Sequence, residues 1–210
     1  MNSPQGRKSI RKTKINPMPL LFPHPTVMVG VHVNGKPDFV TVAWITIACG
    51  TPPWMAIALN HVRHSLKGIR ENMTFSVNIP STAMVKETDY CGIATGAEHD
   101  KAKDCNFKVF YGELDSAPFI EQCPVNIGCI AKHMLNLGSH YLIAGIVQEI
   151  LVSDDCLTDG KPDPSKIDPI AYMTYPALSY HAIGKLLGPA FRIGKEIKDV
   201  KDNRERQLAK

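Results

Sequence analysis

A short alternating segment followed by a tight turn constrains the fold of this chain more than any other feature. In Val27–Val33 a valine stands at every second position, which is the period of a β-strand with one buried face. Asn34 and Gly35 follow, and both tolerate the positive φ that a type I′ hairpin turn requires. We therefore predict an antiparallel hairpin whose return strand, rich in β-branched and aromatic residues, runs over Phe39–Cys49.

The rest of the chain adds strands more often than helices. Helices are expected at Leu66–Asn72 with Ser65 as cap, and from Ser81 as cap towards Tyr90. Loops or short helices are expected over Cys91–Lys108, and a polar loop over Asp154–Pro169. The expected strands are Trp54–Leu59, Thr74–Ile79, a second hairpin from Val125–Leu135 and Tyr141–Val152, and an edge strand at Ile170–Tyr175.

This order of elements indicates the fold class. Six or more strands with two short helices lack the strand–helix alternation of a doubly wound sheet. The sequence therefore predicts a mainly β protein, a closed or partly closed antiparallel barrel with Greek-key connections. The expected organisation is a basic arm over residues 1–16, one domain over 17–194 and a charged tail over 195–210.

The positive charge of the chain is confined to its start. The net charge is +4, yet five Lys and Arg residues and no acid lie within the first fourteen residues, so the remainder carries about −1. Such an arm could contact nucleic acid or an anionic membrane, but without interleaved aromatic residues a solvated terminus is the favoured interpretation. We thus expect no nucleic acid and no membrane among the partners.

The chain shows no sign of export or membrane insertion. No apolar core of a signal peptide follows the basic arm, and no segment reaches the ~18 consecutive apolar residues of a membrane helix. We therefore predict a cytoplasmic protein whose six scattered cysteines are free thiols, since they form no Cys-x-x-Cys pair and no zinc-type spacing with histidine. A metal site is not expected.

Few residues suggest chemistry by themselves, because the common nucleotide-binding and hydrolase motifs are absent from the sequence. The segment Asn60–Ser65, between a strand and a helix, offers a guanidinium, a hydroxyl and helix amides that suit a phosphate. From these residues alone, an ordinary serine cap with two exposed side chains is the favoured interpretation. Trp44, in mid-strand, is more typical of the core, although it could form a flat wall for a planar ligand. His140, after a Gly-Ser turn, could lie at the mouth of a cavity, although a lone histidine is more often a surface or satisfied core residue. Asp100 and Lys101, taken alone, are typical of a solvated charge pair.

In combination these residues resemble the flavin reductase-like family, and within it the flavoredoxin-type branch, over roughly Pro19–Ile197. The resemblance rests on the order and spacing of several short segments along the chain. The matching segments are Phe39–Trp44, Thr51–Pro53, Arg63–Ser65, Phe75–Pro80, Thr88–Gly92 with Thr95–Gly96, Asp100–Lys101, Glu121–Asn126, Leu137–His140 and Ile183–Gly188. Two positions and one segment depart from the branch: Asp38 replaces a common Asn, Ala102 replaces a common Phe, and Met173–Leu178 replaces the usual short turn.

The resemblance implies an FMN-binding split β-barrel, usually a homodimer with the flavin near the subunit interface. Carried over by position, Thr41, Val42, Ala43 and Trp44 would line the isoalloxazine. Asn60, Arg63 and Ser65 would serve the phosphate and ribityl end. Lys101 and His140 would flank the ring system or its phosphate side, with the Lys101 charge favouring reduced flavin.

These implications lead to three hypotheses about function. The first is an NAD(P)H-dependent flavin reductase that passes hydride to N5 of FMN, with His140 as the catalytic residue that orders the nicotinamide or supplies a proton. The second is a flavoredoxin-like electron carrier with tightly bound FMN, no nicotinamide activity and a redox protein as partner. The third is a nucleic-acid-associated module that uses the basic arm.

Overall fold

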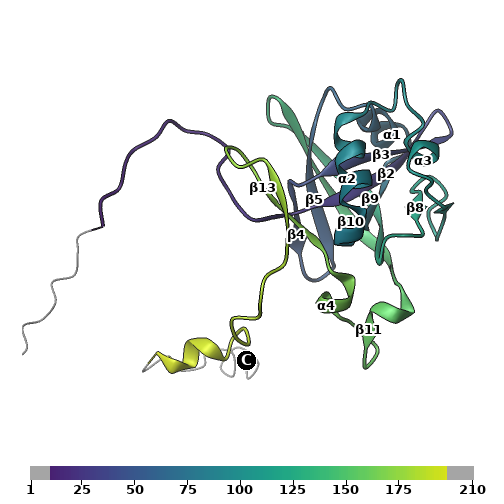
Figure 1. Ribbon diagram of the computed structural model, residues 1–210. Helices are drawn as coiled ribbons and strands as arrows, with labels where there is room; N and C mark the ends of the chain where they lie inside the picture. Colours follow the sequence, from purple (N-terminus) through teal and green to yellow (C-terminus); the bar gives the residue numbers. More distant parts are fainter. Residues whose placement is uncertain (1–9, 198–210) are drawn as a thin grey trace, which may run out of the picture.

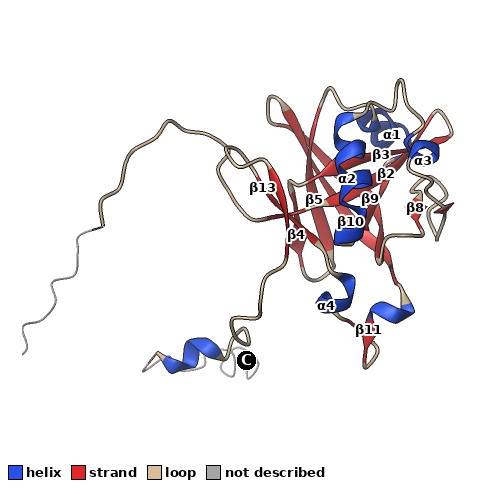
Figure 2. Ribbon diagram, viewed as in Figure 1, coloured by secondary structure: helices blue, strands red, loops and turns tan. Residues whose placement is uncertain are grey.

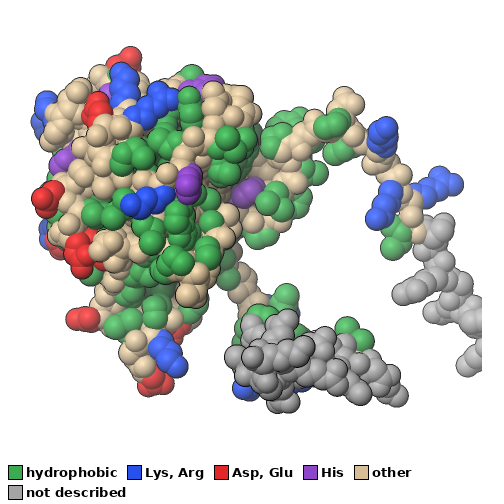
Figure 3. All heavy atoms as spheres, turned by 180° about the vertical axis from the view of Figure 1, so that it is seen from behind, with side chains coloured by type: hydrophobic (Ala, Val, Ile, Leu, Met, Phe, Trp, Pro, Cys, Tyr) green, Lys and Arg blue, Asp and Glu red, His purple; other side chains and the backbone are tan. Residues whose placement is uncertain are grey.

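A β-barrel forms the body of the protein, and the first and last of the described residues extend away from it (Figure 1). The computed structural model describes residues 10–197. Residues 10–22 contain no helix or strand and are exposed throughout. Residues 1–9 of the predicted basic arm and 198–210 of the predicted charged tail lie outside the described residues. Figure 3 shows basic side chains on the described part of the N-terminal arm, well clear of the body.

Strands dominate the described chain, and the helices are short (Figure 2). The helices are α1 (Ser65–Asn72), α2 (Val85–Ile93), α3 (Lys101–Asp104) and α4 (Pro164–Ile167), with 3₁₀ turns η1 (Thr82–Met84), η2 (Asp154–Cys156) and η3 (Ile193–Glu196). The long strands are β2 (Val27–Val33), β3 (Lys36–Val42), β4 (Ile45–Cys49), β5 (Trp54–Asn60), β6 (Thr74–Ile79), β9 (Val125–Asn136) and β10 (His140–Val152). The short ones are β1 (His24–Pro25), β7 (Val109–Phe110), β8 (Phe119–Ile120), β11 (Leu157–Thr158), β12 (Lys161–Pro162), β13 (Ile170–Met173) and β14 (Ser179–Ala182).

The seven long strands form one antiparallel sheet in the order β3-β2-β6-β9-β10-β5-β4. Strands β3 and β4 are consecutive in the chain but lie at opposite ends of this order, so the sheet curls round without a hydrogen-bonded closing pair. This arrangement confirms the predicted mainly β fold and its partly closed, split barrel. The first hairpin is also as predicted, because Asn34 and Gly35 have φ values of 52° and 73°.

The predicted return strand over Phe39–Cys49 is wrong, because this segment is two strands. Strand β3 ends at Val42 and β4 begins at Ile45. Between them the chain crosses from one end of the sheet to the other. The Ile45 amide bonds back to the Ala43 carbonyl at 3.1 Å, and the Trp44 carbonyl accepts from the Ala58 amide at 2.8 Å. Ala43 and Trp44 therefore form a bend at the split in the barrel.

Strand β2 is covered on both faces, which corrects the prediction of a half-buried first strand. The valines of β2 belong to the larger apolar cluster inside the barrel, together with residues such as Ile57 and Phe75. Met28, on the opposite face of β2, packs with Phe39 and Cys91 in a second cluster. Helices α2 and α3 lie against β3 there (Figure 1), so the residues between the valines are buried too.

Several local predictions about caps and edges are wrong for identifiable reasons. Ser65 is the first residue of α1 and not its cap, and its hydroxyl donates to the carboxylate of Asp38 on β3. Ser81 makes no side-chain cap either, since η1 intervenes before α2. The polar segment 154–169 contains η2, β11, β12 and α4. Strand β13 is the centre of a small β1-β13-β14 sheet and not an edge.

The six cysteines are free thiols, and most of them are buried. Cys91, Cys123, Cys129 and Cys156 are buried, whereas Cys49 is exposed. Burial raises the pKa of the Cys91, Cys123 and Cys129 thiols, so they stay protonated near neutral pH. Within residues 10–197 no three His, Cys, Asp or Glu side chains gather as a metal site, and no helix is long and apolar enough to cross a membrane.

Candidate functional site

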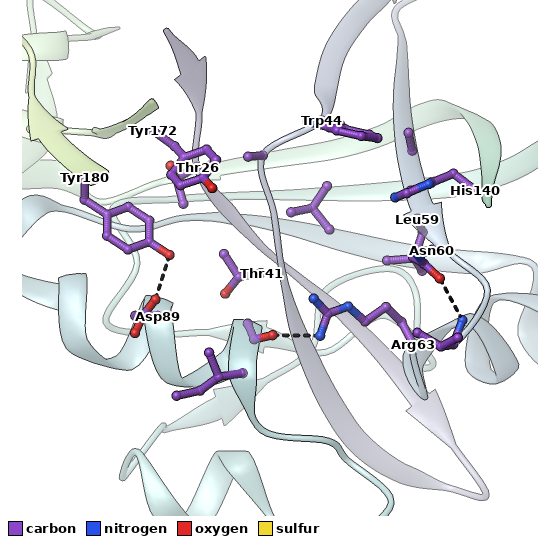
Figure 4. A pocket seen from close by; sticks show the side chains of 16 residues that line it. Thr26, Thr41, Trp44, Leu59, Asn60, Arg63, Asp89, His140, Tyr172 and Tyr180 are labelled. Atoms are coloured by element: carbon purple, nitrogen blue, oxygen red, sulfur yellow. Dashed lines mark hydrogen bonds between the residues drawn. The ribbon is translucent and has the colours of Figure 1, made fainter. Parts of the chain in front are cut away.

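A pocket of about 360 Å³ opens beside the bend at Ala43 and Trp44 (Figure 4). We call it the central pocket. Its walls come from the end of β3, the bend, the end of β5, the start of β10, the C-terminal end of α2 and the β13–β14 hairpin. The lining residues are Thr26, Thr41, Val42, Ala43, Trp44, Ala58, Leu59, Asn60, Val62, Arg63, Asp89, Gly92, Ile93, His140, Tyr172 and Tyr180.

The bend gives the pocket two backbone donors and a ring. Because neither residue continues a strand, the amides of Ala43 and Trp44 donate to no acceptor within residues 10–197. Both residues are half-buried and line the central pocket. Trp44 was expected in mid-strand, and the break in pairing is what frees these amides. A free amide pair beside an apolar ring can bind the polar edge of a planar ligand.

His140 lies against Trp44. Strand β10 begins at His140, which pairs with Asn60 at the end of β5, so the register brings both residues to this end of the barrel. The imidazole and indole centroids are 4.7 Å apart with the planes inclined by 34°. His140 Nδ1 is 2.8 Å from the Ser139 hydroxyl. Partial burial, then the nearby His61 and Arg63, lower the pKa of His140 below its ordinary value of 6.5, so the ring is neutral at pH 7.

Arg63 supplies positive charge to the central pocket. The turn before α1 positions it, because the Arg63 amide donates to the Asn60 carbonyl at 3.0 Å. Its Nη1 donates to the carbonyl of Gly92 at 2.7 Å, which ties the end of α2 to this turn. No acidic side chain forms a salt bridge with Arg63 in the described part of the chain.

A tyrosine pair forms the side of the pocket opposite Trp44 and His140 (Figure 4). Tyr172 and Tyr180, from β13 and β14, have ring centroids 5.5 Å apart. The Tyr180 hydroxyl donates to Asp89 Oδ1 on α2 at 3.0 Å, which fastens the hairpin to the barrel. Thr26, 2% exposed, lines the same pocket, and its Oγ1 has no hydrogen-bond partner among the described residues. An unpartnered buried hydroxyl in a pocket lining is an acceptor or donor available to a ligand.

A smaller cavity of about 200 Å³, the side pocket, adjoins the central one. The two share Val62 and Arg63. The remaining lining residues are Val40, His64, Ser65, Ala94, Thr95, Gly96 and Lys101. The amides of His64 and Ser65, at the start of α1, have no backbone acceptor in residues 10–197. Free amides at a helix N-terminus beside Lys101 and Arg63 suit an anion.

Lys101 is not the solvated residue that its sequence suggests. It is 3% exposed, and its Nζ lies 2.9 Å from Oδ1 of Asp38, which is itself 5% exposed. The Ser65 hydroxyl donates to Oδ2 of the same carboxylate at 2.5 Å. Asp100 caps α3 by accepting from the Lys103 amide. The predicted pairing of Asp100 with Lys101 is therefore wrong, and Asp38 is the true partner.

The structure thus divides the sequence-predicted site residues between two adjoining cavities. Seven of them line the central pocket: Thr41, Val42, Ala43, Trp44, Asn60, Arg63 and His140. Ser65 and Lys101 line the side pocket instead. Sequence reasoning missed Thr26, Tyr172 and Tyr180, and it passed over Asp89 and Gly92 although the matched segment Thr88–Gly92 contains both. The sequence did contain one signal for them: Tyr175-Pro176 indicates a turn between the two tyrosines, and a hairpin turn there would bring them together.

Comparison with known proteins places this chain in a family. The family model described as "Flavin reductase like domain" matches residues 18–177. The flavoredoxin of Methanosarcina acetivorans is 36% identical, with a TM-score of 0.85 over 89% of this chain and 99% of that one. The chain belongs to the flavin reductase-like family, in its flavoredoxin branch.

A second flavoredoxin supports this assignment, and a further solved structure shares the fold. The flavoredoxin of Desulfovibrio vulgaris (Miyazaki F) is 30% identical, with a TM-score of 0.82 over 88% of this chain and 100% of that one. An FMN-binding protein of Thermus thermophilus is 20% identical, with a TM-score of 0.72 over 87% and 100%, a likeness that shows the fold alone. Family membership supports a flavin-binding redox function for this flavin reductase-like protein.

Proposed function

We propose that this flavin reductase-like protein binds FMN with the isoalloxazine in the central pocket and the phosphate in the side pocket, and that NAD(P)H reduces it. The observation that carries the proposal is the bend at Ala43 and Trp44, where two unbonded amides stand beside an indole in the lining of the central pocket. An isoalloxazine has one apolar and one polar edge, so it matches this combination of donors and ring surface.

The side pocket supports FMN over an unphosphorylated flavin. The free amides of His64 and Ser65 lie at its wall, and the positively charged Arg63 borders both cavities. A ligand that fills both pockets therefore has its planar part near Trp44 and its anionic part near α1. The unpartnered Thr26 hydroxyl is available to polar atoms of such a ligand.

When bound, FMN supplies a two-electron acceptor whose N5 takes hydride from a nicotinamide. The protein tunes this couple through charge. Arg63 has no carboxylate partner in residues 10–197, so its charge favours the more negative, reduced form. Two unit charges about 4 Å apart interact by up to ~4 kcal/mol at an effective dielectric of about 20. The family resemblance implies this role for Lys101, but Asp38 neutralises the charge of Lys101, so Arg63 takes the role in the proposal.

His140 is proposed to orient the nicotinamide. Its Nδ1 is engaged with Ser139, which leaves Nε2 for a hydrogen bond to a bound nucleotide. Because its pKa is lowered, the ring is neutral at pH 7 and acts through hydrogen bonding and stacking on Trp44. The proton-donor role considered from the sequence is therefore set aside in favour of orientation.

The second candidate function is a flavoredoxin-like electron carrier without nicotinamide activity. The identity of 36% with a flavoredoxin favours it. An apolar groove of about 480 Å³ beside the central pocket also favours it, since Trp44 lines both and the groove is otherwise formed by residues such as Leu20, Ile45 and Leu142. A redox protein or a second copy of the chain seated there would contact the wall of the flavin site. The homodimer stays a prediction.

Steady-state kinetics separates the two candidates. Purified protein is mixed with NADH or NADPH and FMN in tenfold excess over protein, and nicotinamide oxidation is followed by absorbance. The reductase proposal expects oxidation that scales with protein concentration. If the protein binds FMN in a fluorescence titration but leaves both nucleotides unoxidised, the electron carrier is the correct function.

A further inference from the structure

The carboxylate of Asp38 lies directly behind the side pocket. It is 5% exposed and does not line the cavity itself. Its Oδ1 accepts from Lys101 Nζ at 2.9 Å, and its Oδ2 accepts from the Ser65 hydroxyl at 2.5 Å. His64 Nδ1 is 3.4 Å from the same Oδ2. Three lining residues of the side pocket thus direct polar atoms at one buried carboxylate.

Gly96 shows how closely the chain encloses this group. A Cβ on Gly96 would lie 2.2 Å from Asp38 Oδ1, so only glycine lets the loop over 94–96 cover the carboxylate. Ala94, at the start of this loop, offers its carbonyl to Lys101 Nζ at 3.5 Å. The Asp38–Lys101 pair is therefore enclosed between β3, α3 and this loop, where solvent screens its charges little.

The arrangement has a consequence for any anion in the side pocket. A buried ammonium with its own carboxylate is close to neutral as a pair, so Lys101 contributes little net field to the cavity. The Ser65 hydroxyl is likewise engaged with Asp38. A phosphate entering the pocket must compete with Asp38 for these donors and also approach a buried negative charge.

We propose that Asp38 is a positioning residue that fixes Lys101 and Ser65 in the ligand-free protein and weakens the binding of phosphorylated flavin, which makes FMN exchangeable. This inference rests on the proposed function, because it assumes that the side pocket receives the FMN phosphate. Asp38 would then lower the affinity of the side pocket for a phosphate without contacting the phosphate itself.

The test compares FMN with riboflavin, which has the same ring system and no phosphate. Dissociation constants of both flavins are measured by fluorescence quenching for the wild-type protein and for Asp38→Asn. Asparagine has the same shape and still accepts from Ser65 or Lys101 but carries no charge. In the wild-type protein the phosphate is expected to improve affinity by less than tenfold. In Asp38→Asn the preference for FMN is expected to rise at least another tenfold, with riboflavin affinity unchanged.

Asp159→Asn is the matched control, because it removes the same charge from an exposed turn between β11 and β12, where Asp159 has a φ of 51° that asparagine tolerates. It should leave both constants unchanged. A wild-type preference for FMN of a hundredfold or more overturns the inference even where Asp38→Asn fails to fold. An unchanged or reduced preference in the folded variant also overturns it. If neither flavin binds the wild-type protein, the proposed function fails as well.

Discussion

Trp44 and His140 lie with ring centroids 4.7 Å apart, the first at the split in the barrel and the second at the start of β10. Trp44 directly precedes β4, which is separated from β10 by β5 in the order of the main sheet. Their contact depends on the bend that ends β3, because that bend turns the indole towards the end of β5. The ring pair therefore joins the barrel's split to the wall of the central pocket.

Replacing the indole tests its place in the flavin site. Trp44→Ala should raise the dissociation constants of FMN and riboflavin alike, by roughly tenfold, because an aromatic pair contributes about 0.5–1.5 kcal/mol beyond its buried area. Fluorescence titration measures both constants. Trp54→Ala is the control, since Trp54 stacks on His133 with centroids 5.6 Å apart outside the central pocket. Equal losses in the two variants would show that the effect on binding is not local to the pocket.

The lowered pKa of His140 predicts a defined pH dependence. The ring is neutral at pH 7 and 8, so the rate of flavin reduction by NADH should be constant between these values. The rate should change only below pH 6.5, as the ring takes up a proton. Because the folded protein resists that protonation more than the unfolded chain, His140 also lowers stability as the pH falls through 6.5.

His140→Ala provides the matching variant for anaerobic stopped-flow measurements. It should slow reduction by NADH about tenfold, change the FMN dissociation constant less than threefold, and abolish the break below pH 6.5. A variant that is reduced at the wild-type rate rules out the orienting role.

Arg63 is expected to set the flavin potential. Arg63→Gln can keep the hydrogen bond to Gly92 but removes the charge, so the midpoint potential should become more negative by at least ~30 mV, the equivalent of ~1.4 kcal/mol for two electrons. Arg70→Gln is the control, because Arg70 is exposed on α1 and lies over the Tyr141 ring. Spectroelectrochemical titration measures the shift. Equal potentials in the wild type and Arg63→Gln contradict the assignment.

Local patterns in the sequence predicted most of the barrel, because strand periodicity and turn chemistry depend on neighbouring residues. The Asn34-Gly35 turn and the hairpin of β9 and β10 are examples. The bend at Ala43 and Trp44 could not be predicted this way. Trp44 and the β-branched residues on either side of the bend have good strand propensity, and the break arises only because β4 must pair with β5 at the far end of the sheet.

The site shows the same limit more sharply. Seven predicted residues meet in the central pocket because they lie at strand ends that the barrel brings together. The partner of Lys101 could not be predicted from spacing. Asp38 and Lys101 are far apart in the sequence, whereas Asp100 is the immediate neighbour of Lys101. Only the packing of α3 against β3 brings Lys101 to Asp38. Tyr172 and Tyr180 were missed for a similar reason, since only the docked hairpin brings them to the pocket.

The central claim is that this chain holds FMN and takes electrons from a nicotinamide. An anaerobic visible spectrum of the purified protein with one equivalent of FMN, before and after NADH or NADPH is added, tests it most directly. The account predicts a bound flavin whose ~450 nm band, the wavelength expected of an oxidised flavin, bleaches on addition of at least one nucleotide. A flavin that stays free in solution, or a bound flavin that neither nucleotide bleaches, contradicts it.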